Sequence, residues 1–212
     1  MSITVGAITT LALALSVTGA GPAFAQDSGA QAFVEGERLK IVALLRQPAS
    51  PDRDADIGQA VETLADYVEL SRRSLGEPCP KAEPGCQDHW ASLSEDQRAE
   101  VIGLVKQLVA RRVVDGLRSV LDYGVTYKGV KRNAEGDARV RTEIRSRRDP
   151  HAPAMEVDYV VRPAPGGYRV VDIVTDGSSL TRNYYDQIHL LFANRSNGYT
   201  SLVAKLSEVA RR

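Results

Sequence analysis

The protein has 212 residues, and its charges balance, with 27 Lys and Arg against 27 Asp and Glu. A net charge of zero excludes the bulk electrostatic attraction that draws basic proteins to nucleic acid. The length suffices for one domain with a sizeable hydrophobic core, and the sequence contains no internal repeat and no linker to a second domain.

The first 25 residues have the composition of a secretory signal peptide. They contain no charged side chain, include an apolar segment over residues 11–17, and end in Ala23-Phe24-Ala25, a small-x-small pattern that signal peptidases cleave. The alternative is an unusual apolar N-terminal helix, because the Lys or Arg that normally precedes the apolar segment is missing. We predict cleavage after Ala25, with residues 26–212 forming a single, soluble, exported domain. No later run reaches the roughly 18 apolar residues of a membrane span.

Apolar side chains spaced three and four residues apart predict three helices in the first half of the chain. The first covers about residues 33–46, after a small and polar segment over residues 26–32 that we expect to be frayed. The second runs over about residues 56–76. Ser94 and Gln97 form a capping-box pattern at the start of the third helix, which is predicted to be the longest.

The two cysteines, Cys79 and Cys86, lie in a loop rich in proline and glycine between the second and third helices. In an oxidising compartment this spacing predicts a local disulfide, which stabilises the fold by roughly 2.5 kcal/mol in the chain-entropy model. The alternative is metal or redox chemistry. A metal site needs more ligands than two thiols and His89, and the C-x-x-C spacing of a redox motif is absent.

From Tyr123 onward the apolar side chains alternate with polar ones, which predicts four strands separated by short turns. The strands fall at about residues 123–127, 140–146, 155–161 and 168–175. Two helices follow, over about residues 179–193 and 199–210, and Ser178 or Ser179 is the predicted N-cap of the first. This order predicts an α+β fold in which helices pack on one side of a curved, antiparallel, four-stranded sheet.

The sequence lacks the common catalytic and cofactor motifs, including the Walker loop, G-x-G-x-x-G, H-E-x-x-H and G-x-S-x-G. We therefore expect no cofactor. The three histidines, His89, His151 and His189, have no close-spaced partners, so we interpret them as ordinary polar residues and predict no metal site.

Asp158 and Asp172 on neighbouring strands, together with Tyr159, are the one candidate acid/base group. Alternation places Asp158 opposite Tyr159, so we interpret Asp158 as facing solvent and Asp172 as hydrogen-bonded to local backbone. The arginines of the second strand form a basic sheet face, which we interpret as solvated. The alternative for that face is a docking surface for anionic lipid headgroups or an acidic partner.

The C-terminal block YRVVDIVTDGSSLTRNYYDQIHLLFANRSNGYTSLVAKL resembles the end of the MlaC family, also called the toluene-tolerance auxiliary family. The matching residues are, in the family's order, Tyr168, Val170, Asp172, Ile173, Asp176-Gly177, Ser179-Leu180, Asn183-Tyr184, Gln187, Gly198, Leu202 and Leu206. Upstream matches are Leu75-Gly76, Trp90, Leu93-Ser94 and Gln97-Arg98. One departure is the pair Arg111-Arg112, which stands where the long helix of the family usually carries Thr-Tyr.

The resemblance implies a cone-shaped, NTF2-like sheet with helices around a hydrophobic pocket. It also implies a phospholipid-binding shuttle of the periplasm, which carries lipid between an outer-membrane lipoprotein complex and the MCE-domain protein of an inner-membrane ABC transporter and so maintains the lipid asymmetry of the outer membrane. The candidate lipid-binding residues are Leu108, Leu117, Val140, Ile144, Val157, Tyr159, Val170, Leu180 and Tyr184. Which face of the strand over residues 168–175 lines the pocket stays open, because both faces are apolar. The alternative function is a small enzyme or small-ligand module on the same fold, using Asp172 and a pocket tyrosine.

Overall fold

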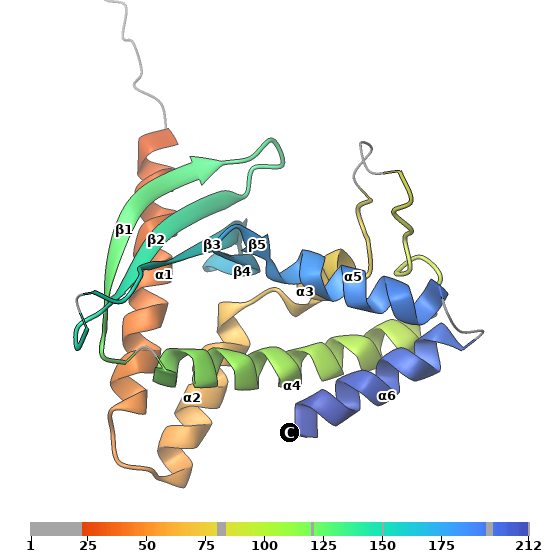
Figure 1. The fold of residues 1–212 in the computed structure, drawn as a ribbon, viewed down its shortest axis with the longest axis horizontal. Coiled ribbons are helices and arrows are strands. Elements are labelled where there is room, and N and C mark those ends of the chain that lie inside the picture. Colours follow the sequence, from red (N-terminus) through yellow and green to blue (C-terminus); the bar gives the residue numbers. More distant parts are fainter. Residues whose placement is uncertain (1–22, 80–83, 120, 150, 194–196, 212) are drawn as a thin grey trace, which may run out of the picture.

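A computed structural model of the protein describes residues 23–79, 84–119, 121–149, 151–193 and 197–211, which form six helices and one five-stranded sheet (Figure 1). The helices before the sheet are α1 (Ala23–Leu45), α2 (Pro51–Leu64), α3 (Tyr67–Ser74) and α4 (Glu95–Ser119), and those after it are α5 (Leu180–Ala193) and α6 (Gly198–Arg211). The predicted α+β order is confirmed. Within the described ranges, no helix has both the length and the apolar character needed to cross a membrane.

The N-terminal helix α1 is longer than predicted. It begins at Ala23, so the expectation of a frayed segment over residues 26–32 is wrong. Ala30 is fully buried in the main core, and this packing keeps the segment helical. Residues 1–22, which make up most of the predicted signal peptide, lie outside the described residues, and cleavage after Ala25 stays a prediction.

The single helix predicted over residues 56–76 is in fact two helices, α2 and α3. The chain leaves helical geometry at Ala65 and Asp66, and the Asp66 carboxylate accepts a hydrogen bond of 2.9 Å from the backbone N–H of Glu69. Asp66 is therefore the N-cap of α3. Ala65 forms a parallel bridge with Val170 in the sheet, which holds the break in place. The apolar spacing runs through the break, so periodicity alone joined the two helices.

The long helix α4 begins as predicted. The backbone N–H of Ser94 donates to Gln97 Oε1 at 2.9 Å, and the backbone N–H of Gln97 donates to Ser94 Oγ at 3.3 Å. This reciprocal pair is the capping box that the sequence indicates. α4 packs along α6 and lies below α3 and α5 in the view of Figure 1, and its buried side chains are Val101, Val105, Leu108 and Val109.

The four predicted strands are confirmed as β1 (Tyr123–Arg132), β2 (Ala138–Ser146), β3 (Met155–Ala164) and β4 (Gly167–Thr175). They pair antiparallel in chain order, and a two-residue strand, β5 (Ser178–Ser179), extends the sheet beside β4. The pairing shifts by one residue between Tyr127 and Gly129 of β1 and again opposite Val160 and Val161 of β3. Such bulges bend and twist a sheet, which agrees with the predicted curvature.

Two arginines on the outer face of β2 are paired with acidic groups. Arg139 Nε donates to Asp158 Oδ2 at 2.7 Å, and Arg145 Nε donates to Glu143 Oε1 at 2.6 Å. Asp158 is buried, so the expectation that it faces solvent is wrong. The guanidinium of Arg139 covers it, and this pairing offsets the cost of desolvating a carboxylate.

A cluster of buried charges, here called the Asp137 cluster, fixes α3 against the sheet. Asp137 lies just before β2 and accepts hydrogen bonds from Arg73 Nη2 of α3 at 2.6 Å and from Arg162 Nε of β3 at 2.7 Å. Glu69 of α3 pairs with the same two arginines, at 2.8 and 3.0 Å. Because every buried charge has an opposite partner, the cluster joins three elements that are far apart in the sequence.

Candidate functional site

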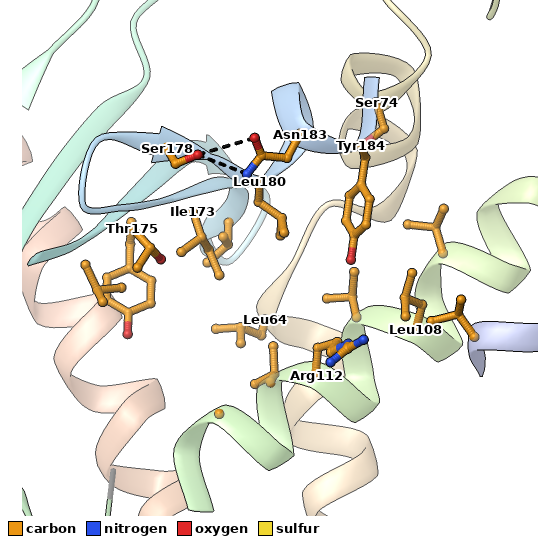
Figure 2. A pocket seen from close by; sticks show the side chains of 18 of the residues that line it. Leu64, Ser74, Leu108, Arg112, Ile173, Thr175, Ser178, Leu180, Asn183 and Tyr184 are labelled. Carbon is orange, nitrogen blue, oxygen red and sulfur yellow. Dashed lines mark hydrogen bonds between the residues drawn. The ribbon is translucent and has the colours of Figure 1, made fainter. Parts of the chain in front are cut away.

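A cavity of about 780 Å³ lies between the inner face of the sheet and the surrounding helices (Figure 2). Side chains from every helix and from strands β2 to β5 line it. Those lining residues that are buried or half-buried are aliphatic or aromatic, apart from Arg38 and Ser74. The volume falls in the upper part of the range for small-molecule sites, which is about 300–1,000 Å³.

The structure brings eight of the nine predicted pocket residues to this cavity. They are Leu108, Leu117, Ile144, Val157, Tyr159, Val170, Leu180 and Tyr184. Val140 is the exception: it is fully buried in the main core and does not line the cavity. Its part of β2 is covered by α1, which packs across β1 and β2 and contributes Val34 to the same core. A role of the eight residues in ligand binding stays a prediction.

A β-bulge decides which side chains of β4 face the cavity. Val170, Ile173 and Thr175 line it, although strict alternation places Val170 and Ile173 on opposite faces of a strand. Val160 pairs with Asp172 whereas Val161 pairs with Val170, so Val171 is an extra residue in β4. The extra residue reverses the alternation and turns both apolar side chains inward.

The exposed residues of the lining mark where the cavity meets solvent, and they are here called the mouth ring. Every exposed lining residue is polar or a glycine. The members of this mouth ring are Arg112, Gly116 and Ser119 of α4, Thr175 of β4, Ser178 of β5, Asn183 and Gln187 of α5, and Lys205 of α6. No local pattern marks these residues in the sequence, because they come from five separate elements. The site is thus apolar inside and polar at its opening.

Asp172 has the local structural role that the sequence indicates. Its carboxylate accepts hydrogen bonds from the hydroxyl of Ser179 at 2.6 Å, from the backbone N–H of Thr181 at 3.0 Å and from its neighbour Ile173 at 2.9 Å. Ser179 in turn accepts a hydrogen bond of 3.1 Å from the backbone N–H of Arg182, which confirms it as the N-cap of α5. Asp172 ties β4 to the start of α5 and does not line the cavity.

The two tyrosines of the cavity are poor bases at neutral pH. Burial raises the pKa of Tyr159 to about 12. Burial also raises the pKa of Tyr184, although the positive charge of Arg112 lowers it in part. Both phenols therefore stay protonated, and the described lining contains no Asp or Glu that could accept a proton from them. This arrangement suits the binding of an apolar ligand better than proton transfer.

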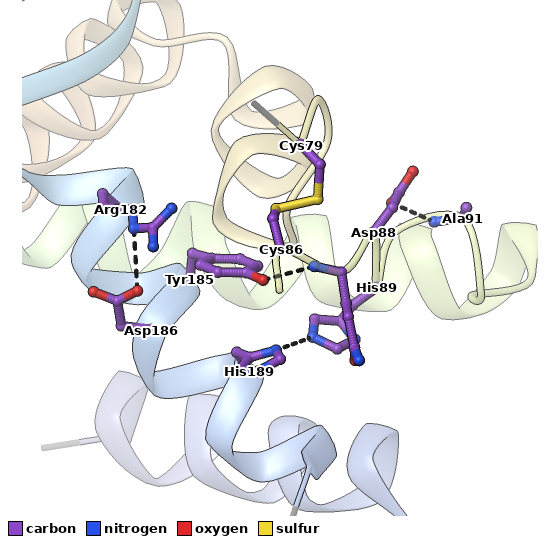
Figure 3. The surroundings of a disulfide bond; sticks show 10 residues. Cys79, Cys86, Asp88, His89, Ala91, Arg182, Tyr185, Asp186 and His189 are labelled. Carbon is purple, nitrogen blue, oxygen red and sulfur yellow. Dashed lines mark hydrogen bonds and ion pairs between the residues drawn. A yellow bond between two sulfur atoms is a disulfide. The ribbon is translucent and has the colours of Figure 1, made fainter. Parts of the chain in front are cut away.

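The predicted disulfide between Cys79 and Cys86 is present. The segment after it is held against α5, because the backbone N–H of Gln87 donates to the hydroxyl of Tyr185 at 2.9 Å (Figure 3). Among the described residues, no group of three or more His, Cys, Asp or Glu side chains is arranged to hold a metal ion.

Two of the histidines, His89 and His189, contact each other. This contact could not be predicted from the sequence, because the two residues lie far apart in it. His89 Nε2 lies 3.0 Å from His189 Nδ1, and the ring of His89 stacks on Phe192 with centroids 4.4 Å apart (Figure 3). His89 is only 5% exposed. Burial first, and then the charge of His189, lower the pKa of His89, and Asp88 offsets these effects in part. One of these two nitrogens carries a proton and donates it in a hydrogen bond to the other, so both rings can be neutral.

The His89 contact predicts a loss of stability in mild acid. A histidine whose pKa is lowered by folding takes up a proton more readily in the unfolded chain. Its contribution to the stability of the folded protein is therefore complete above about pH 6.5 and falls as the pH drops below that value. We expect the melting temperature to decrease between about pH 7.5 and about pH 5.5. His89→Asn should flatten this decrease, whereas His151→Asn, in an exposed turn, should leave it unchanged. An equal pH dependence in all three proteins would contradict the assignment.

Comparison with known proteins agrees with the fold. The MlaC protein family matches residues 39–208, and no curated protein matches the sequence. A solved structure, the phospholipid-binding protein from Ralstonia solanacearum in complex with a phospholipid, has a TM-score of 0.65 to this chain and 23% sequence identity. The alignment covers 86% of this chain and 97% of that protein, so the two share one fold over nearly their whole length. Since the family match extends from α1 through the sheet into α6, the chain belongs to the MlaC family.

Proposed function

We propose that the protein is a phospholipid carrier with no catalytic activity. The observation that carries this proposal is the division of the cavity into an apolar interior and a polar mouth ring. Burying acyl chains gains about 0.8 kcal/mol per CH₂ group, so a lipid crosses an aqueous space only inside an apolar cavity with its headgroup at the opening. The phospholipid bound to the Ralstonia protein supports the same ligand class for this chain.

The carrier is proposed to work in the periplasm, between an outer-membrane lipoprotein complex and the MCE-domain protein of an inner-membrane ABC transporter. It would maintain the lipid asymmetry of the outer membrane and contact membranes only transiently. Membership of the MlaC family supports this route. The signal-peptide pattern of residues 1–25 and the disulfide support export, since disulfides persist in oxidising compartments.

A binding role is supported over an enzymatic one by the chemistry of the lining. An enzyme needs polar groups that converge on a reacting atom, whereas the inner lining here is aliphatic and aromatic except at Arg38 and Ser74. Asp172 is the acid that the alternative enzymatic function requires. Its carboxylate already accepts hydrogen bonds from the hydroxyl of Ser179 and from two backbone N–H groups.

Native mass spectrometry of the protein, purified from a bacterial periplasm without detergent, tests the proposal. We expect a mass increase that corresponds to bound glycerophospholipid, identified after extraction. Protein that stays free of lipid, both as purified and after incubation with phospholipid vesicles, would overturn the carrier function.

A substitution that fills the cavity should displace the lipid. Val157→Trp places a large ring in the cavity, and extra volume in an occupied site costs about 1–3 kcal/mol, so lipid occupancy should fall about tenfold. Val160→Trp is the matched control, because Val160 lies on the same strand and does not line the cavity. Equal lipid occupancy in the two folded variants would place the lipid elsewhere.

A further inference from the structure

The charged residues that line the cavity are of one sign. They are the cations Arg38 of α1, Arg112 of α4 and Lys205 of α6, and the described lining includes no Asp or Glu. The chain as a whole has no net charge, so this imbalance is local to the cavity. A ligand that enters the cavity meets a positive potential that no carboxylate of the described lining offsets.

Arg112 differs from the other two cations in its surroundings. Arg38 is half-buried and donates to the hydroxyl of Tyr127 at 3.4 Å, and Lys205 pairs with Glu208 at 3.2 Å. Arg112 is exposed at the mouth, and among the described residues it makes no hydrogen bond or ion pair. Its guanidinium therefore has its full set of donors available to a ligand.

The geometry of the mouth directs Arg112 toward the polar end of a bound lipid. In Figure 2 the hydroxyl of Tyr184 on α5 points across the cavity toward the part of α4 that carries Arg112. The aliphatic side chains Leu64 and Leu108 line the cavity on either side of Arg112 in this view. A lipid whose acyl chains occupy the apolar interior thus leaves its phosphate at the level of Arg112.

We propose that Arg112 binds the phosphate of the carried lipid and makes the cavity prefer headgroups with a net negative charge over zwitterionic ones. This inference rests on the proposed carrier function. A guanidinium binds phosphate oxygens through two parallel N–H donors, which a lysine cannot reproduce. A zwitterionic headgroup brings a cation of its own to a mouth that already holds Arg112 and Lys205, and this repulsion lowers its share of the bound lipid.

A competition for lipid uptake tests the preference. The delipidated protein is incubated with vesicles that hold equal amounts of phosphatidylglycerol and phosphatidylcholine with identical acyl chains, and the bound lipids are counted by native mass spectrometry. Because Arg112 is exposed, we expect a preference for phosphatidylglycerol of about three- to fivefold at low salt, decreasing as salt screens the charges. Arg112→Gln should take up the two lipids equally, and Arg112→Lys should keep part of the preference.

Arg111→Gln is the matched control, since it removes the same charge from the neighbouring position. Arg111 donates to the backbone carbonyl of Ala210 at 2.9 Å and does not line the cavity, so its loss should leave the preference intact. Equal uptake by the unaltered protein, or an unchanged preference in Arg112→Gln, would overturn the inference while lipid binding itself stands. Uptake of neither lipid would instead overturn the carrier function. Displacement of lipid by free glycerol phosphate would assign Arg112 to a soluble anion and would also overturn the inference.

Discussion

Asp137→Asn is expected to lower the free energy of unfolding by about 3–5 kcal/mol, as is typical when one member of a buried ion pair is removed. The Asp137 side chain has no solvent exposure, and it accepts hydrogen bonds from Arg73 and Arg162. Asparagine keeps the shape but loses the charge, and its amide group presents donors where two guanidinium groups already donate. Glu69 alone then faces both arginines, so positive charge remains buried without full compensation.

The effect can be measured by denaturant unfolding followed through the fluorescence of Trp90, the only tryptophan in the chain and a buried one. Asp115→Asn is the matched control, because Asp115 pairs with Arg118 at 3.9 Å on the exposed face of α4 and such pairs contribute about 1 kcal/mol or less. If Asp137→Asn lowers the free energy of unfolding no more than this control does, the proposed contribution of the Asp137 cluster to stability is contradicted.

The same cluster predicts behaviour in strong acid. Burial by itself raises the pKa of Asp137, but hydrogen bonds from Arg162 and Arg73 and their charges outweigh it, so the pKa lies below its ordinary value of 3.8. A carboxyl whose pKa is lowered by folding stabilises the protein above its unfolded pKa, and this contribution is lost as the pH falls through the folded value. The difference in free energy of unfolding between the unaltered protein and Asp137→Asn, measured by denaturant unfolding, should therefore shrink as the pH falls below 3.8.

Gly76→Ala is expected to cost about 3 kcal/mol or more, or to prevent folding, because two separate penalties apply at this position. Gly76 has a φ of +90°, and a Cβ atom there would lie 2.3 Å from the carbonyl oxygen of Gln87 and 2.7 Å from the ring of Tyr185. The close approach is needed because His89 returns to the end of α3, where its backbone N–H donates to Leu75 at 2.8 Å. Neither neighbour can move without disturbing the hydrogen bonds that join Gln87 to Tyr185 of α5 and His89 to Leu75.

Gly136→Ala separates the two penalties. Gly136 has a similar φ of +86° but no atom within 4 Å of the added Cβ, so only the backbone cost of about 1–2 kcal/mol applies. Thermal or denaturant unfolding of both variants measures the difference, which is the cost of the clash. Equal losses at the two glycines would show that the segment over residues 87–89 can move away freely.

Local patterns in the sequence were sufficient for most of the elements. The capping box of Ser94 and Gln97, the alternation in β1 to β4 and the turn sequences between the strands each depend on residues a few positions apart. The break between α2 and α3 could not be found in this way, because Asp66 acts as a cap only once Ala65 is held by Val170 of the sheet. The same holds for Asp158, which is buried by an arginine of the neighbouring strand.

The sequence by itself determined the α+β order and the disulfide between Cys79 and Cys86. It also indicated seven side chains outside β4 that line the cavity, because periodicity records which face of an element is apolar. The tertiary structure alone decided which side chains of β4 turn inward, since its two faces are equally apolar and a bulge at Val171 sets the alternation. It also decided the contact of His89 with His189 and the place of Arg112 at the mouth. Polar side chains at such points carry no periodic signal, and their partners come from elements that only folding brings together.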